Sequence, residues 1–153
     1  MSYDIQVKDV PPQTALLVAR TVSMATIAEE MGAAFAAIMA HVSCGGGQIV
    51  GPPFCTYPDM AGGETFRVEV CMPVAPGAKP GPGVEVVTVP GASVAWTLHK
   101  GPYSAVGAAY GAISAWVAAN GRQSGGPPRE IYLNDPAQVA PEELLTEVDW
   151  PLA

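Results

Sequence analysis

The chain has 153 residues, of which 49% are hydrophobic and 14% are charged, a composition that excludes an intrinsically disordered protein and predicts one folded domain. Its formal net charge is -7 and its sequence holds no cluster of Lys and Arg, which argues against nucleic-acid binding by this chain alone. No apolar run approaches the roughly 20 residues of a membrane span, and the first residues do not resemble a secretory signal. We therefore expect a cytoplasmic protein without a membrane partner.

The cysteine content also favours a cytoplasmic protein. Cys44, Cys55 and Cys71 are odd in number and form no C-x-x-C pair, which predicts reduced and mostly buried thiols. His41 and Cys44 are too few ligands for a zinc site, which needs three or four. We expect no metal and no cofactor.

The first half of the chain alternates between strand and helix patterns. Pro11-Pro12 ends the first strand, because proline cannot continue a hydrogen-bonded ladder. Apolar residues then recur at steps of three and four over residues 27–42, which predicts a helix with Ser23 as its N-cap and Gly45-Gly46-Gly47 as its stop. The predicted strands of this half are residues 5–10, 15–22, 54–57 and 65–72.

The second half follows a linker rich in Pro and Gly at residues 73–83. Its first two strands flank Pro90-Gly91, a pair typical of a hairpin turn. A helix is predicted over residues 103–120, with Gly121 as its stop. The predicted strands of this half are residues 85–89, 93–99, 129–133 and 143–150.

The two halves repeat each other. The alanine-rich segment 32–42 aligns with 107–117, and the same spacing aligns Gly51-Pro52-Pro53 with Gly126-Pro127-Pro128. We interpret the chain as one domain of two pseudo-repeats, 1–75 and 84–153, each a strand-strand-helix-strand-strand unit. Two such units predict an α+β fold with one antiparallel sheet and both helices on one face.

The two copies differ at one chemically important position. Glu130 and Tyr132 lie two residues apart in a predicted strand, so their side chains share a face. The first copy keeps the tyrosine, at Tyr57, but has Cys55 in place of the carboxylate. This asymmetry makes Glu130 the first candidate for a functional residue.

Five segments of the second half stand in a characteristic order. They are His99–Tyr103, Ala109-Tyr110 with Trp116, Gly126–Pro128, Glu130–Pro136 and Thr146–Leu152. In this order and spacing they resemble the GyrI-like small-molecule-binding domain, the effector-binding module of AraC-type and MerR-type multidrug regulators. Because the chain begins directly with a strand rather than a DNA-binding segment, it is similar to the stand-alone members of that family.

The resemblance implies a ligand groove between the repeats, with aromatic walls and an acidic residue at its floor that maps onto Glu130. The candidate aromatic residues are Tyr132, Tyr57, Trp96, Tyr103, Tyr110 and Trp116. The alternatives are a surface position for Glu130, or an ion pair with Arg129 or Arg122, and ordinary packing for the aromatic side chains. His99, at a strand end before Gly101, is interpreted as a residue that supports a turn.

Three functions remain open from the sequence. The first is binding or sequestration of lipophilic, cationic small molecules, such as drugs or effectors, because an organic cation would compensate the charge of a carboxylate in an apolar groove. The second is hydrolysis of electrophilic, cyclopropane-type toxins, with Glu130 as general base and Tyr132 beside it. The third is a protein partner, such as a separate regulator or a gyrase that the protein inhibits.

Overall fold

The structure is a computed structural model that describes residues 3–59 and 64–153. The chain forms two compact units. Unit 1 contains the residues up to Pro11 together with Gly91–Ala153, and unit 2 contains Pro12–Pro90. Within the described part of the chain, no helix is long and apolar enough to cross a membrane.

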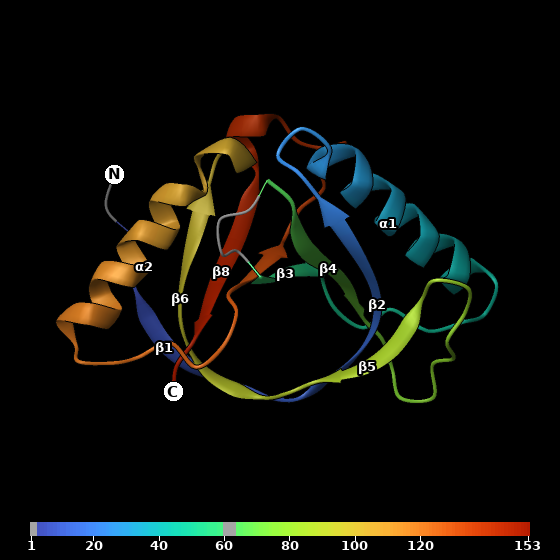
Figure 1. The fold of residues 1–153 in the computed structure, drawn as a ribbon, viewed down its shortest axis with the longest axis horizontal. Coiled ribbons are helices and arrows are strands. Elements are labelled where there is room, and N and C mark those ends of the chain that lie inside the picture. The colour runs from blue at the N-terminus through green and yellow to red at the C-terminus, as the bar shows by residue number, and fades with distance from the viewer. Residues whose placement is uncertain (1–2, 60–63) are drawn as a thin grey trace. The chain divides into compact units, whose positions relative to one another are not determined.

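Unit 1 is an antiparallel sheet with one long helix packed on it (Figure 1). Its strand order is β1-β6-β8-β7, and helix α2 lies against β6 and β8. Ala95 and Val148 from the sheet pack with Ile113 from the helix, and all three are fully buried. The elements are β1 (Gln6–Val10), β6 (Ala92–Lys100), the 3-10 turn η1 (Tyr103–Ala105), α2 (Gly107–Ala119), β7 (Arg129–Tyr132), the 3-10 turn η2 (Pro141–Glu143) and β8 (Leu145–Pro151).

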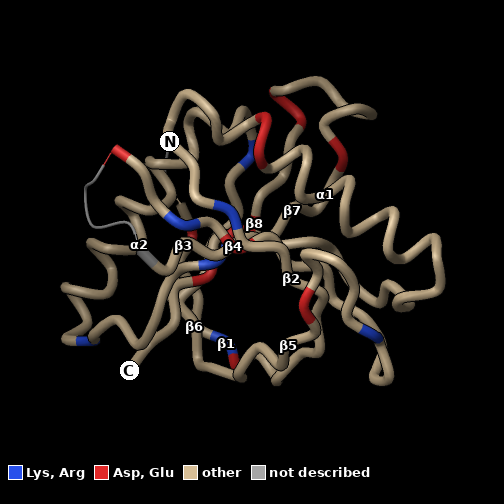
Figure 2. The backbone as a smooth tube through the Cα atoms, turned by 45° about the vertical axis from the view of Figure 1, so that its right-hand side comes forward, with Lys and Arg blue, Asp and Glu red and all other residues tan. Residues whose placement is uncertain are grey.

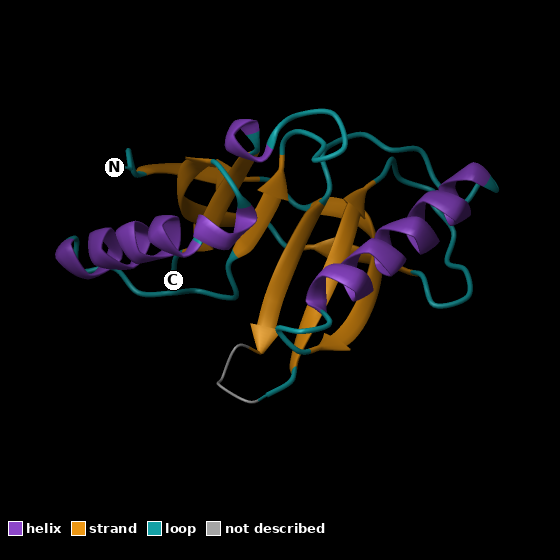
Figure 3. Cartoon of the chain, turned by 90° about the horizontal axis from the view of Figure 1, so that it is seen from above, coloured by secondary structure: helices purple, strands orange, loops and turns teal. Residues whose placement is uncertain are grey.

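Unit 2 has the same kind of architecture. Its strands are antiparallel in the order β3-β4-β2-β5, and helix α1 packs against β2 and β4. Leu16 from β2, Ile38 from α1 and Val70 from β4 are fully buried. Figure 3 distinguishes the helices from the strands in each unit. The elements are β2 (Gln13–Val22), α1 (Ile27–Ser43), β3 (Phe54–Asp59), β4 (Phe66–Pro73) and β5 (Glu85–Val89).

The predicted α+β fold, with antiparallel strands and two helices, is confirmed. The predicted hairpin around Pro90-Gly91 is wrong. Strand β6 uses both of its edges for β1 and β8, and β5 instead pairs with β2. A two-residue link favours a hairpin when only local geometry is considered, but here it carries the chain from one unit to the other.

The exchange of first strands also changes how the repeat maps onto the structure. Strand β1 belongs to the first sequence repeat but pairs with β6, and β5 belongs to the second but pairs with β2. Residues 73–83, the predicted linker, lie inside unit 2. The domain organisation as two pseudo-repeats stays a proposal.

The helix boundaries differ from the predictions at their first turns. Thr26, not Ser23, occupies the N-cap position of α1, and the backbone carbonyl of Ser23 accepts hydrogen bonds from Thr26 N and Ile27 N. The Ser23 prediction is therefore wrong, because a turn separates it from the helix. In the second half, the single predicted helix begins as the separate turn η1 before α2 starts at Gly107.

Candidate ligand site around Glu130

Glu130 lies on β7 and only 8% of it is exposed. Each of its carboxylate oxygens accepts a hydrogen bond from a phenol. Tyr110 Oη on α2 donates to Oε2 at 2.6 Å, and Tyr132 Oη donates to Oε1 at 3.1 Å. The contact of Glu130 with Tyr132 confirms that the two side chains share a face of the strand. The helix and the strand together fix the orientation of the carboxylate.

A third tyrosine extends this group toward solvent. The ring of Tyr103, in η1, stands edge-on to the ring of Tyr132, with 5.5 Å between their centroids. Tyr103 is 38% exposed, so this side of the group can be reached from outside. We call Glu130, Tyr103, Tyr110 and Tyr132 the Glu130 cluster.

The turn that presents Tyr103 is held by its own hydrogen bonds. Gly101 has a φ of 134°, a conformation that favours glycine, and its N–H donates to Leu144 O at 2.8 Å. His99 Nε2 donates to Pro102 O at 3.1 Å, which leaves Nδ1 to accept from Tyr3 Oη at 2.9 Å. The interpretation of His99 as a turn-supporting residue is confirmed.

Beside Tyr132, on the neighbouring strand β8, lies a polar side chain that the sequence patterns did not single out. Thr146 on β8 is directly opposite both Tyr132 and His99 in the strand register, and it is fully buried. Its hydroxyl has no hydrogen-bond partner among the described residues. The sequence could not predict this position, because an alternating pattern does not show which residue of the neighbouring strand lies opposite.

Trp96 and Trp116 do not join the Glu130 cluster. Trp96 is opposite Asp149 in the register, and Asp149 is opposite Arg129, so these three share a face. Glu130, the next residue along β7, faces the other side of the sheet. Trp116 packs on the hydrophobic core of unit 1, as does the ring of Tyr110.

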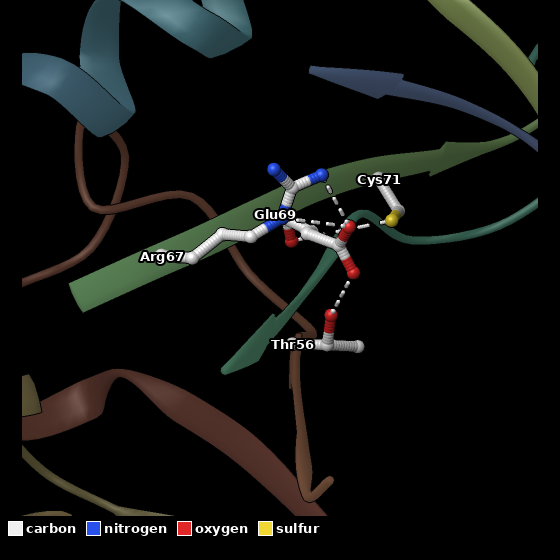
Figure 4. Close-up of polar contacts among 4 residues, drawn as sticks. All are labelled: Thr56, Arg67, Glu69 and Cys71. Carbon is white, nitrogen blue, oxygen red and sulfur yellow. Dashed lines mark hydrogen bonds and ion pairs between the residues drawn. The ribbon is translucent and has the colours of Figure 1, made fainter. Parts of the chain in front are cut away.

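Tyr57 belongs to unit 2, where its ring lies 6.4 Å from that of Phe66. Cys55, which the proposed repeat aligns with Glu130, is fully buried there. Unit 2 has a carboxylate of its own at Glu69, which accepts hydrogen bonds from Thr56 at 3.2 Å and from Arg67 at 3.0 and 3.2 Å (Figure 4). Arg67 and Glu69 stand at i and i+2 of one strand, a spacing from which the sequence could have predicted their ion pair. The charge of Glu69 is therefore already paired within unit 2.

Asp149 is a further carboxyl group that the sequence analysis missed. It is 3% exposed, and burial raises its pKa to about 8 from 3.8, with Glu147 as the next cause through a hydrogen bond and its negative charge. Glu147 and Asp149 stand at i and i+2 of β8, so the sequence already placed them on one face. That they are buried depends on the neighbouring strands.

A sequence model of a family, described as a GyrI-like small molecule binding domain, matches residues 3–153. The comparison with curated protein sequences finds no match.

Solved structures share the fold at low sequence identity. The C-terminal domain of EcmrR superposes with a TM-score of 0.86 and 22% identity, covering 100% of this chain and 99% of that one. A hydrolase from Listeria innocua gives a TM-score of 0.66 and 15% identity, with 97% and 91% covered. SAV2435, solved bound to tetraphenylphosphonium, gives a TM-score of 0.59 and 15% identity, with 100% and 94% covered.

Proposed function

Because the chain belongs to the GyrI-like small-molecule-binding domain family, we propose that it binds a lipophilic, singly charged organic cation at the Glu130 cluster. Glu130 supplies the negative charge, Tyr103 and Tyr132 supply aromatic contacts, and Tyr110 orients the carboxylate through its hydroxyl. The observation that carries the proposal is the pair of phenol hydrogen bonds, one to each oxygen of a nearly buried carboxylate.

The two phenols suit this role for a physical reason. The phenols are neutral donors. They satisfy part of the hydrogen-bonding capacity of the carboxylate and add no positive charge to it. A cation without N–H or O–H groups cannot donate a hydrogen bond, yet it gains from the charge and from tyrosine faces, worth roughly 0.5–2 kcal/mol per contact. Tetraphenylphosphonium, the ligand of SAV2435, is a cation of this kind.

The binding proposal is tested with tetraphenylphosphonium, followed by tryptophan fluorescence and by calorimetry. We expect Glu130→Gln to weaken binding about tenfold or more, which corresponds to about 1.4 kcal/mol, because the amide keeps the shape but loses the charge. The neutral triphenylphosphine oxide should bind the parent and the variant alike. Glu142→Gln, in the exposed turn η2, is the matched control. Equal affinity of the parent and Glu130→Gln for the cation would contradict the proposal.

Hydrolysis with Glu130 as general base is the second candidate function. Each oxygen of Glu130 accepts one phenol hydrogen bond and keeps a further acceptor site, so the carboxylate could also contact a water molecule as a general base. Mass spectrometry of a cyclopropane-bearing electrophile incubated with the protein separates the two functions. A product that disappears with Glu130→Gln would support hydrolysis, the activity named for the Listeria innocua protein. Gyrase inhibition stays a prediction, tested by a supercoiling assay.

A further inference from the structure

The face of unit 1 that points away from α2 carries a second group of charged and aromatic residues. Trp96, Glu147 and Asp149 share this face, because Trp96 is opposite Asp149 in the register and Glu147 precedes Asp149 by two residues. Lys8, from the edge strand β1, reaches over them, and Arg129 lies opposite Asp149 on the other side. We call these five residues the Lys8 cluster.

The ammonium group of Lys8 has two partners in this cluster. Its Nζ donates a hydrogen bond to Glu147 Oε2 at 2.8 Å and lies 4.3 Å from the ring centroid of Trp96. A carboxylate that accepts a hydrogen bond, beside an aromatic face, is the chemistry by which proteins recognise a primary ammonium ion. The Lys8 side chain therefore stands where the ammonium of a bound amine would stand.

Lys8 donates a hydrogen bond to Glu147, but one oxygen of Asp149 in the same cluster receives none. Asp149 is 3% exposed, and its Oδ1 has no hydrogen-bond partner among the described residues. A buried carboxyl oxygen without a donor is costly, so it favours any ligand that brings an N–H group.

We propose that Trp96, Glu147 and Asp149 form a second ligand site, for primary alkylammonium ions, in which the side chain of Lys8 acts as a replaceable internal ligand. Exchange of the Lys8 ammonium for an external one keeps one ammonium group in contact with Glu147. The site needs an N–H donor for Glu147, whereas the Glu130 cluster suits cations that have none. The two sites lie on opposite faces of the sheet, so they are independent.

The Lys8 cluster is accessible where a ligand would enter. The side chain of Lys8 is 38% exposed, and Leu98, which is opposite Glu147 on the same face, is 45% exposed. Glu147 itself is only 14% exposed at its side chain, so the carboxylate is shielded while the edge at Lys8 is open. An alkyl chain entering at this edge would lie along the path that the Lys8 side chain now takes.

The test removes Lys8 and supplies its side chain from solution as n-butylammonium. In Lys8→Ala we expect n-butylammonium to bind at least tenfold tighter than in the parent, by calorimetry, and to raise the thermal midpoint that the substitution lowers. Lys8→Thr, which keeps a residue suited to an edge strand, serves if the alanine variant does not fold. Tetramethylammonium, which has no N–H group, should not rescue either variant.

Two further variants decide the outcome. The double variant Lys8→Ala with Glu147→Gln should lose the gained binding, while Lys8→Ala with Glu130→Gln should keep it. Lys100→Ala is the matched control, because its pair with Glu143 is exposed at 62% on each side chain. The proposal is overturned if n-butylammonium binds the parent and Lys8→Ala equally, or if binding survives the loss of the Glu147 charge.

Discussion

The fold keeps Asp149 protonated at pH values where an exposed aspartate would be ionised. Its pKa is raised from 3.8 to about 8, first by burial and then by Glu147, while Lys8 and Arg129 act in the opposite direction. Between these two pH values the unfolded chain has lost this proton and the folded chain keeps it. The folded state therefore binds more protons, and its stability falls as pH rises.

We expect the urea midpoint of the parent to decrease between about pH 4 and pH 8 relative to that of Asp149→Asn, and the difference to level off above pH 8. Asparagine keeps the shape but has no proton to lose, so subtracting the two curves isolates Asp149. Glu142→Gln, an exposed change of the same charge, should leave the parent's pH dependence intact. Parallel curves for the parent and Asp149→Asn would show that burial does not retain the proton.

The residues of the Glu130 cluster show what the sequence can and cannot predict at this scale. That Glu130 and Tyr132 share a face follows from the two-residue period of any strand. That Tyr110 also reaches Glu130 depends on the angle and height at which α2 packs, which no local pattern contains. The face of Trp96 likewise required the β6–β8 register, since alternation alone gives two equivalent choices.

At the scale of elements, the segment between α2 and β7 is fitted closely onto the end of β8. Ser124 forms a bridge with Leu152, and Gly125 N donates to Pro151 O at 2.8 Å. A Cβ added at Gly125 would lie 2.5 Å from Leu152 O, which is backbone and cannot rotate away. This contact explains a glycine there better than any demand of turn geometry.

Gly125→Ala should destabilise the protein by about 1–3 kcal/mol, because either the segment or the end of β8 must move. The measurement is chemical denaturation, and the control is Gly111→Ala on α2, where nothing lies within 4 Å of an added Cβ. That control should stabilise by about 0.5–1 kcal/mol through helix propensity. A neutral result at Gly125 would mean that this segment is looser than the structure has it.

Element positions were largely predictable, whereas strand partners were not. The periodic patterns located both long helices and all eight strands to within a few residues, because burial of one face imposes them. Pairing joins residues far apart in the chain, such as Val7 with Ala95, and leaves no mark on local sequence. The Pro90-Gly91 link reads locally as a turn, and only the whole topology shows that it is a crossing between units.

At the scale of the molecule, the two units divide the chain differently from the two repeats proposed from the sequence. Basic and acidic residues are distributed along both units, as Figure 2 shows, so charge does not mark the division. Strand pairing marks the division between the units, because β1 and β5 each pair with a strand of the other proposed repeat. The units should therefore be the cooperative blocks.

We expect a fragment of residues 12–90 to unfold cooperatively on heating, since it contains β2 together with both of its partners, β4 and β5. A fragment of residues 1–75, of similar length, should melt broadly, because it lacks β5 and leaves β1 without β6. Circular dichroism and amide hydrogen exchange compare the two. Equal cooperativity would show that the first strands add little to each sheet.

The exchange of first strands also bears on ancestry. A half-length chain with this strand order could not finish its own sheet, since its leading strand has its partner in the other copy. Two such chains could complete both sheets by exchanging their first strands, as in a domain-swapped homodimer. Joined end to end, the pair no longer depends on concentration, and its two copies are free to diverge. Under that history, Cys55 in one copy and Glu130 in the other form a difference that a symmetric dimer of identical chains could not have.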